Sequence, residues 1–148
     1  MTIITIPCCP VAQPRQRVRV VAGRPQNYTP TDSPVNSFKA TARMAWASAS
    51  QAAPLSGPVA LYATFILAKP KGRNRGPSKG ERIWCDRKPD LDNLLKSLMD
   101  ALTGLAWEDD KQIVDLRSTK LYADKDESPH VDVCVMAAND LFGGDVDG

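Results

Sequence analysis

The chain has 148 residues, which suits one domain with a single hydrophobic core. It contains no run of about 18 apolar residues, so we expect no membrane span. The apolar start, Met1–Ile6, lacks the basic flank of a signal peptide. The four cysteines have no C-x-x-C spacing and there is one histidine, which disfavours a zinc site and favours reduced thiols in the cytoplasm.

Charge is distributed unevenly along the chain, although the net charge is only +2. Residues 1–88 hold 14 Lys/Arg and 3 acidic residues, whereas residues 89–148 hold 5 Lys/Arg and 14 acidic residues. Such asymmetry favours a polyanionic partner such as nucleic acid. The alternative is that the two patches pair within the protein or across a dimer.

The first predicted elements are two short strands and a helix. Thr2–Ile6 is β-prone and Arg17–Val21 alternates, which predicts strands on either side of a proline-rich stretch. Gly23 to Pro34 reads as a loop because of its Pro, Asn and Asp residues. Ser37 to about Ala52 is predicted to be a helix that Pro54 closes.

The later elements carry stronger patterns. Val59–Ala68 is apolar and predicts a central strand, whereas Pro70–Lys88, rich in glycine and cations, predicts a long flexible loop. Asp92–Leu102 places leucines at helical spacing and predicts a helix. Gln112–Tyr122 and His130–Ala137 alternate as two further strands.

The order ββαβαββ predicts an α+β fold, a small mixed sheet with two main helices packed on one face. We expect a single domain over residues 1–138. Residues 139–148 form an acidic, glycine-rich tail that we expect to be frayed.

Acidic residues gather at the predicted second helix. Asp90 and Asp92 are two apart, so in an extended segment they point the same way. If the helix begins near Asp92, then Asp92, Lys96 and Asp100 share one polar stripe. Carboxylates packed closely together repel one another, so a fold that gathers them usually needs a cation to hold them. A hard cation such as Mg²⁺ suits this place because it takes oxygen ligands. The structural alternatives are that Asp92 caps the helix and that Lys96 makes only a weak ion pair.

Trp107–Asp110 forms a second acidic segment, in the turn before the next strand. Because helix and strand follow each other directly, we expect this turn to return near one end of the helix. A carboxylate from it would then complete a metal site with Asp90 and Asp92. The alternative is a solvated acidic turn. Trp107 is predicted to be a core anchor.

Together these segments resemble the RusA family of Holliday junction resolvases, many of which phages and prophages encode. The resemblance rests on Asp90-Leu-Asp-Asn-Leu-x-Lys96, Asp100-Ala-Leu102 and Trp107-x-Asp-Asp-x-Gln-Ile-Val-Asp115. Weaker matches are Gln13-Pro-Arg-Gln-Arg17 and Tyr28-Thr-Pro30.

The resemblance implies a Mg²⁺-dependent homodimer that nicks two opposed strands of a four-way DNA junction, with Mn²⁺ as a plausible substitute and no small-molecule cofactor. By motif position, Asp90, Asp92 and Asp110 would bind the metal and Lys96 would be the essential lysine. Asp109 stays open as the alternative to Asp110. Asp100, one turn beyond Lys96, is a possible further partner of the site.

The basic half of the chain is expected to contact DNA phosphates. A solvated linker is the alternative for the stretch 69–88. The predicted contacts are Arg15, Arg17, Arg19, Lys69, Lys71, Arg73, Arg75, Lys79, Arg82, Arg87 and Lys88.

Three other functions stay open at this point. A related metal nuclease would act on flaps, forks or other branched DNA. A non-catalytic DNA-binding protein would use the same basic loop and ignore Mg²⁺. An interaction module whose acidic half mimics DNA would bind a basic protein. The last two do not require the Asp90, Asp92, Lys96 and Asp110 constellation.

Overall fold

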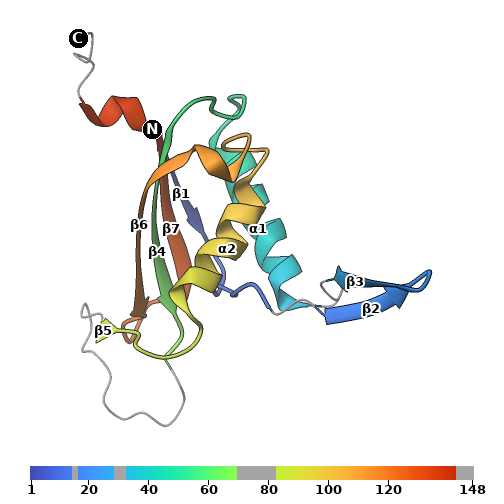
Figure 1. Cartoon of the computed structure of the whole chain (residues 1–148). Coiled ribbons are helices and arrows are strands. Elements are labelled where there is room, and N and C mark those ends of the chain that lie inside the picture. The colour runs from blue at the N-terminus through green and yellow to red at the C-terminus, as the bar shows by residue number, and fades with distance from the viewer. Residues whose placement is uncertain (15–16, 29–32, 70–82, 143–148) are drawn as a thin grey trace.

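The structure, a computed structural model, describes residues 1–14, 17–28, 33–69 and 83–142. Its main sheet has the strand order β1-β7-β4-β6-β5, and β4 and β6 are parallel while the other neighbours are antiparallel. Two helices cover one face of this sheet (Figure 1). The predicted α+β fold with a mixed sheet and two main helices is confirmed. The bounds are β1 Thr2–Ile6, α1 Pro34–Ala49, β4 Val59–Leu67, β5 Ile83–Trp84, α2 Leu91–Leu102, β6 Ile113–Tyr122 and β7 His130–Ala137.

The core lies between the helices and the sheet. Alternate residues of β4, such as Leu61 and Phe65, meet Phe38 of α1 and Leu94 and Leu98 of α2. Strand alternation and helical spacing therefore turn the apolar side chains toward one another. In the described residues, no helix is long and apolar enough to cross a membrane.

A separate hairpin corrects the prediction that residues 23–34 form a loop. β2 (Arg17–Val21) pairs with β3 (Arg24–Tyr28), and the pair stands away from the sheet and helices (Figure 1). Ala22 and Gly23, with φ of 53° and 77°, make the turn. Two-residue hairpin loops need such left-handed residues, and Pro25 is tolerated because a strand edge needs no donor there.

Three boundaries also differ from the predictions. The helix predicted from Ser37 begins at Pro34, because proline suits the first helical position. Residues 70–82 of the predicted loop lie outside the described residues, but Ile83–Trp84 is strand β5. Part of the predicted tail is a 3-10 helix, Ala138–Phe142, whose first N–H donates to Pro58. The observed order of helices and strands is therefore βββαββαββ.

Candidate metal centre

Asp90 and Asp92 lie together at the N-terminal end of α2, and both are exposed. Asp90 occupies the N-cap position but its side chain makes no capping hydrogen bond. Asp92 lies in the first turn, so the alternative that Asp92 caps the helix is wrong. Capping therefore accounts for neither carboxylate, and their oxygens suit a hard cation.

The three residues of the predicted polar stripe on α2 do not all act at one place. Lys96 is exposed, one turn beyond Asp92. Asp100 instead forms an ion pair with Lys39 of α1 at 3.5 Å. Asp100 thus serves the contact between the helices, and Lys96 is the cation of the stripe that accompanies the Asp90–Asp92 pair.

Lys120 of β6 contributes to this end of the molecule, and the sequence patterns did not single it out. Its Nζ donates to the carbonyl of Arg87 at 2.5 Å and to that of Pro89 at 2.9 Å. These contacts hold the segment that leads into Asp90, across a cis Lys88–Pro89 bond. The contact joins residues more than thirty apart in the chain, so strand alternation alone could not predict it.

Three cations lie close to the Asp90–Asp92 pair in the chain or at the same end of the sheet. Arg87 and Lys88 are exposed and precede it directly. Lys69 follows the end of β4, and because β4 and β6 are parallel this is the end where Lys120 lies. Three of the predicted DNA contacts therefore lie at the same end of the sheet as Asp90 and Asp92. They are Lys69, Arg87 and Lys88.

Asp110 lies at the other end of α2. Its Oδ1 accepts hydrogen bonds from the Thr103 hydroxyl at 2.5 Å and the Trp107 indole N–H at 3.0 Å. Thr103 is the C-cap residue of α2, whose 12 residues span about 18 Å at 1.5 Å per residue. Within the described residues of one chain, no three His, Cys, Asp or Glu side chains are grouped to hold a metal.

The acidic turn does return near one end of the helix, as expected, but this is the C-terminal end of α2 and not the end at which Asp90 and Asp92 lie. The physical reason is Trp107, which is completely buried and whose backbone bridges to Thr103. The prediction of Trp107 as a core anchor is confirmed. Because that anchor fixes the turn at the C-terminal end of α2, Asp110 stays there too.

Asp109 and Asp110 have different surroundings. Asp109 caps the 3-10 helix Asp110–Gln112, since its Oδ1 accepts from the Lys111 N–H at 2.9 Å. Asp110 is half-buried, and the two donors on Oδ1 fix its orientation. Asp109 therefore caps the turn, whereas Oδ1 of Asp110 is held by Thr103 and by the buried Trp107.

The hairpin presents a second group of cations. The Arg19 guanidinium lies 4.9 Å from the ring centre of Tyr28, and its Nε donates to Gln26. Arg17 belongs to the same strand, opposite Tyr28. The remaining predicted DNA contacts, Arg15, Lys71, Arg73, Arg75, Lys79 and Arg82, lie outside the described residues.

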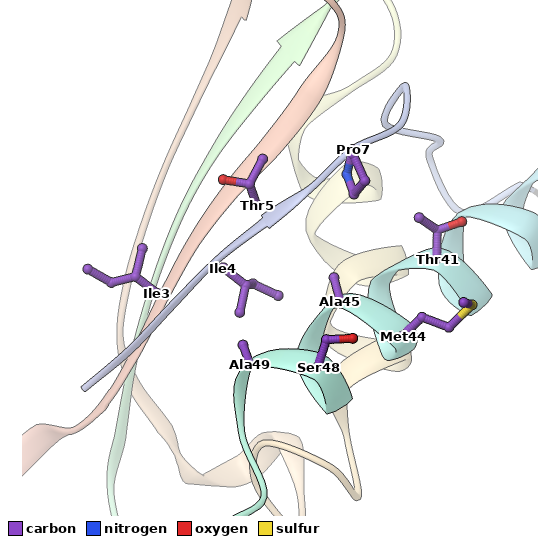
Figure 2. Close-up of a pocket in the computed structure, with 9 residues that line it drawn as sticks. All are labelled: Ile3, Ile4, Thr5, Pro7, Thr41, Met44, Ala45, Ser48 and Ala49. Carbon is purple, nitrogen blue, oxygen red and sulfur yellow. The ribbon is translucent and has the colours of Figure 1, made fainter.

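An apolar groove lies between β1 and α1 (Figure 2). It has a volume of about 520 Å³, and Ile3, Pro7 and Met44 are among the residues that line it. None of its lining residues is acidic or basic. Since β1 is at the opposite edge of the sheet from β6 and β5, the groove is separate from the candidate metal centre.

Two comparisons with known proteins show what the chain is similar to. A protein called YqaN from Bacillus subtilis (strain 168), described as uncharacterized, is 33% identical over 134 residues, which cover 85% of this chain and 89% of the relative. The model of the family "Endodeoxyribonuclease RusA" matches residues 7–136, which include both the Asp90–Lys96 and the Trp107–Asp115 segments. The chain therefore belongs to the RusA family of endodeoxyribonucleases.

Proposed function

We propose that this protein is a Mg²⁺-dependent endodeoxyribonuclease that resolves four-way DNA junctions by paired, symmetric nicks. The observation that carries the proposal is the exposed Asp90–Asp92 pair beside Lys96, Arg87 and Lys88, in a member of an endodeoxyribonuclease family. Mn²⁺ is expected to substitute for Mg²⁺, since carboxylate oxygens bind both ions.

The residues at the start of α2 fit a hard cation and a phosphate together. The Asp90 side chain is not used as a helix cap, so both of its oxygens are available as ligands. The first N–H groups of a helix have no partner within the helix, and they carry a partial positive charge. A phosphate oxygen is therefore favoured beside a cation that Asp90 and Asp92 hold.

Each side chain then has a distinct task. Asp90 and Asp92 bind the cation, and the Lys96 ammonium stabilises the negative charge that develops on the phosphate. Arg87 and Lys88 bind neighbouring phosphates and fix the position of the strand. When bound, Mg²⁺ would polarise the scissile phosphate and lower the pKa of an attacking water.

Symmetric cutting requires two sites related by a two-fold axis, so we propose a homodimer. The hairpin supports binding to DNA arms, because Arg19 and Arg24 are both exposed there. An exposed strand pair with cations suits the phosphate backbone, whose recognition is independent of sequence.

The test is cleavage of a synthetic four-way junction, beside a linear duplex and a fork, with Mg²⁺ and with EDTA. We expect paired symmetric nicks in the junction, lost in EDTA. Asp92→Asn should lower the cleavage rate by at least ~100-fold, since a metal ligand contributes several kcal/mol, while junction binding persists.

The matched control is Asp100→Asn, which alters an exposed acid of the same helix that pairs with Lys39. It should cut like the wild type. Junction binding with no cleavage in any divalent metal would instead indicate a non-catalytic DNA-binding protein. Equal cutting of forks would indicate a broader branched-DNA nuclease.

A further inference from the structure

The β2–β3 hairpin has two chemically different faces. In an antiparallel pair, directly opposed residues share a face and successive residues alternate between faces. Arg19 lies opposite Gln26, and its Nε donates to the Gln26 side chain at 3.2 Å. Arg24 lies opposite Val21 on the same face. Because both arginines are exposed, this is the cationic face of the hairpin.

The opposite face of the hairpin is apolar. Val20 lies opposite Pro25, and Val18 points to the same side as Val20. Val18 and Val20 are 65% and 73% exposed, and Pro25 is exposed as well. Neighbouring strands lie about 4.8 Å apart, so these side chains form one continuous strip, with Asn27 at its edge opposite Val18. We call Val18, Val20 and Pro25 the apolar face.

No other element of the described chain covers the apolar face. The hairpin makes extensive contact with no other helix or strand among the described residues, and it stands away from them (Figure 1). An isolated two-stranded hairpin is only marginally stable in water, and an exposed apolar strip marks an interaction surface. The arginines on the reverse side suit a polyanion, and the family is one of endodeoxyribonucleases. The partner that fits both faces is therefore DNA.

The hairpin is anchored beside the candidate metal centre. The Gln13 N–H donates to the carbonyl of Asn93, in the first turn of α2, at 3.0 Å. The hydroxyl of Ser97, which is completely buried, donates to the carbonyl of Val11 at 2.6 Å. β2 begins at Arg17, and four residues of extended chain span at most about 14 Å. DNA at the hairpin is therefore close to DNA at the start of α2.

Few surfaces of DNA fit an apolar face. The sugar–phosphate backbone is polar and charged, and base edges in the grooves are read mainly through hydrogen bonds. The flat faces of the bases are apolar, but in a continuous duplex each base pair covers the next. At a branch point, the base pairs that end the arms lose a stacking neighbour when the junction opens. Apolar side chains pack as wedges against such unstacked bases in other DNA-binding proteins.

We propose that the apolar face of the hairpin packs against base pairs unstacked at a DNA branch point, and that this contact gives the protein its preference for branched DNA over linear duplex. The inference rests on the proposed function for its substrate, branched DNA. It does not depend on cleavage, so it is tested through binding alone.

The test is the double substitution Val18→Thr/Val20→Thr. Threonine keeps nearly the shape and the strand preference of valine, but it puts a hydroxyl where a methyl group was. Binding to a labelled four-way junction and to a linear duplex is measured in EDTA by fluorescence anisotropy. We expect the Kd for the junction to rise by about 10-fold, because two apolar contacts are lost. The Kd for the duplex should change by less than about 2-fold, because duplex offers no unstacked base to this face.

A fluorescent base reports the unstacking directly. 2-Aminopurine becomes brighter when it leaves its stacked neighbours. Placed beside the branch point, it should brighten when wild-type protein binds and brighten less with Val18→Thr/Val20→Thr at saturating protein. Placed in the middle of an arm, it should not respond to either protein.

The matched control is Val21→Thr, the same change on the cationic face of the same hairpin, at a 46% exposed residue. It should keep the wild-type preference for the junction. Arg19→Gln and Arg24→Gln should instead weaken junction and duplex binding by a similar factor, and each should lower the slope of log affinity against log salt by about 1.

Several results would overturn the inference. One is a wild type that does not prefer the junction in EDTA, and another is a double variant that keeps the preference and the 2-aminopurine signal. A Val21→Thr protein that loses as much as the double variant would place the contact on the wrong face. If deoxyuridine in place of thymine near the branch point weakens wild-type binding by about 10-fold, the face reads thymine methyl groups in a groove instead.

Cleavage separates this inference from the proposed function. A wild type that binds and unstacks junctions through the apolar face but cuts no DNA in Mg²⁺ or Mn²⁺ would remove the proposed nuclease and leave the inference intact. A wild type that cuts junctions, together with a double variant that binds them equally well, would remove the inference alone.

Discussion

Trp107 donates its indole N–H to Oδ1 of Asp110 at 3.0 Å. The tryptophan is completely buried, whereas the aspartate is half-buried. The bond therefore connects the core to the acidic turn and holds Oδ1 of Asp110 in place. A core residue thus orients a candidate metal ligand.

Trp107→Phe should weaken both stability and cleavage. The change leaves Asp110 with one donor fewer and opens space in the core, so we expect a loss of about 2 kcal/mol or more in the free energy of unfolding. With the carboxylate less well oriented, junction cleavage should fall by about 10-fold. Urea unfolding and single-turnover cleavage measure the two effects.

Trp84→Phe is the control for that substitution, since Trp84 is 70% exposed. It should change the free energy of unfolding by less than about 0.5 kcal/mol. Equal effects of the two substitutions would contradict the role given to the Trp107–Asp110 bond.

Gln112→Ala should destabilise the acidic turn without involving a metal. The Gln112 amide donates to the carbonyls of Leu55 and Gly57 at 2.8 and 3.0 Å, and its Oε1 accepts from the N–H groups of Glu108 and Asp109 at 2.9 and 2.7 Å. Only the bond to Leu55 is part-buried and the other three are exposed, so their loss should cost about 1–2 kcal/mol in unfolding free energy. Lys111→Ala, at an exposed neighbour, should stay within about 0.5 kcal/mol of the wild type in the same urea titration. A Gln112→Ala protein as stable as Lys111→Ala would contradict this account.

Lys120→Met tests whether the segment before Asp90 must be held in place. Methionine keeps much of the apolar stem, but it cannot donate to the carbonyls of Arg87 and Pro89. We expect single-turnover cleavage to fall by about 10-fold, because a small displacement of a ligand is costly. Junction affinity, measured by fluorescence anisotropy, should change less than the cleavage rate. Lys125→Met removes an exposed lysine from a turn, and it should leave cleavage unchanged. A drop confined to affinity would mean that Lys120 acts on DNA directly.

Local patterns predicted most elements of this fold. The leucines of α2 repeat at helical spacing, and its start was predicted to within one residue. The alternation in β6 and β7 was equally informative, because a strand with one buried face must alternate. β3 was missed since its Pro25 and Asn27 are typical of loops, and its pairing depends on the turn at Ala22 and Gly23.

The sequence by itself determined that Asp90 and Asp92 lie near each other. Asp90 and Asp92 are two residues apart, so their proximity follows from chain geometry alone. The end of α2 to which Asp110 returns was decided only by tertiary structure, because burial of Trp107 and its contacts with Thr103 fix the turn. The same holds for Lys120, whose partners lie far away in the chain. Periodicity indicates which face of a helix or strand is buried. Packing between distant segments decides which end of that element another segment approaches.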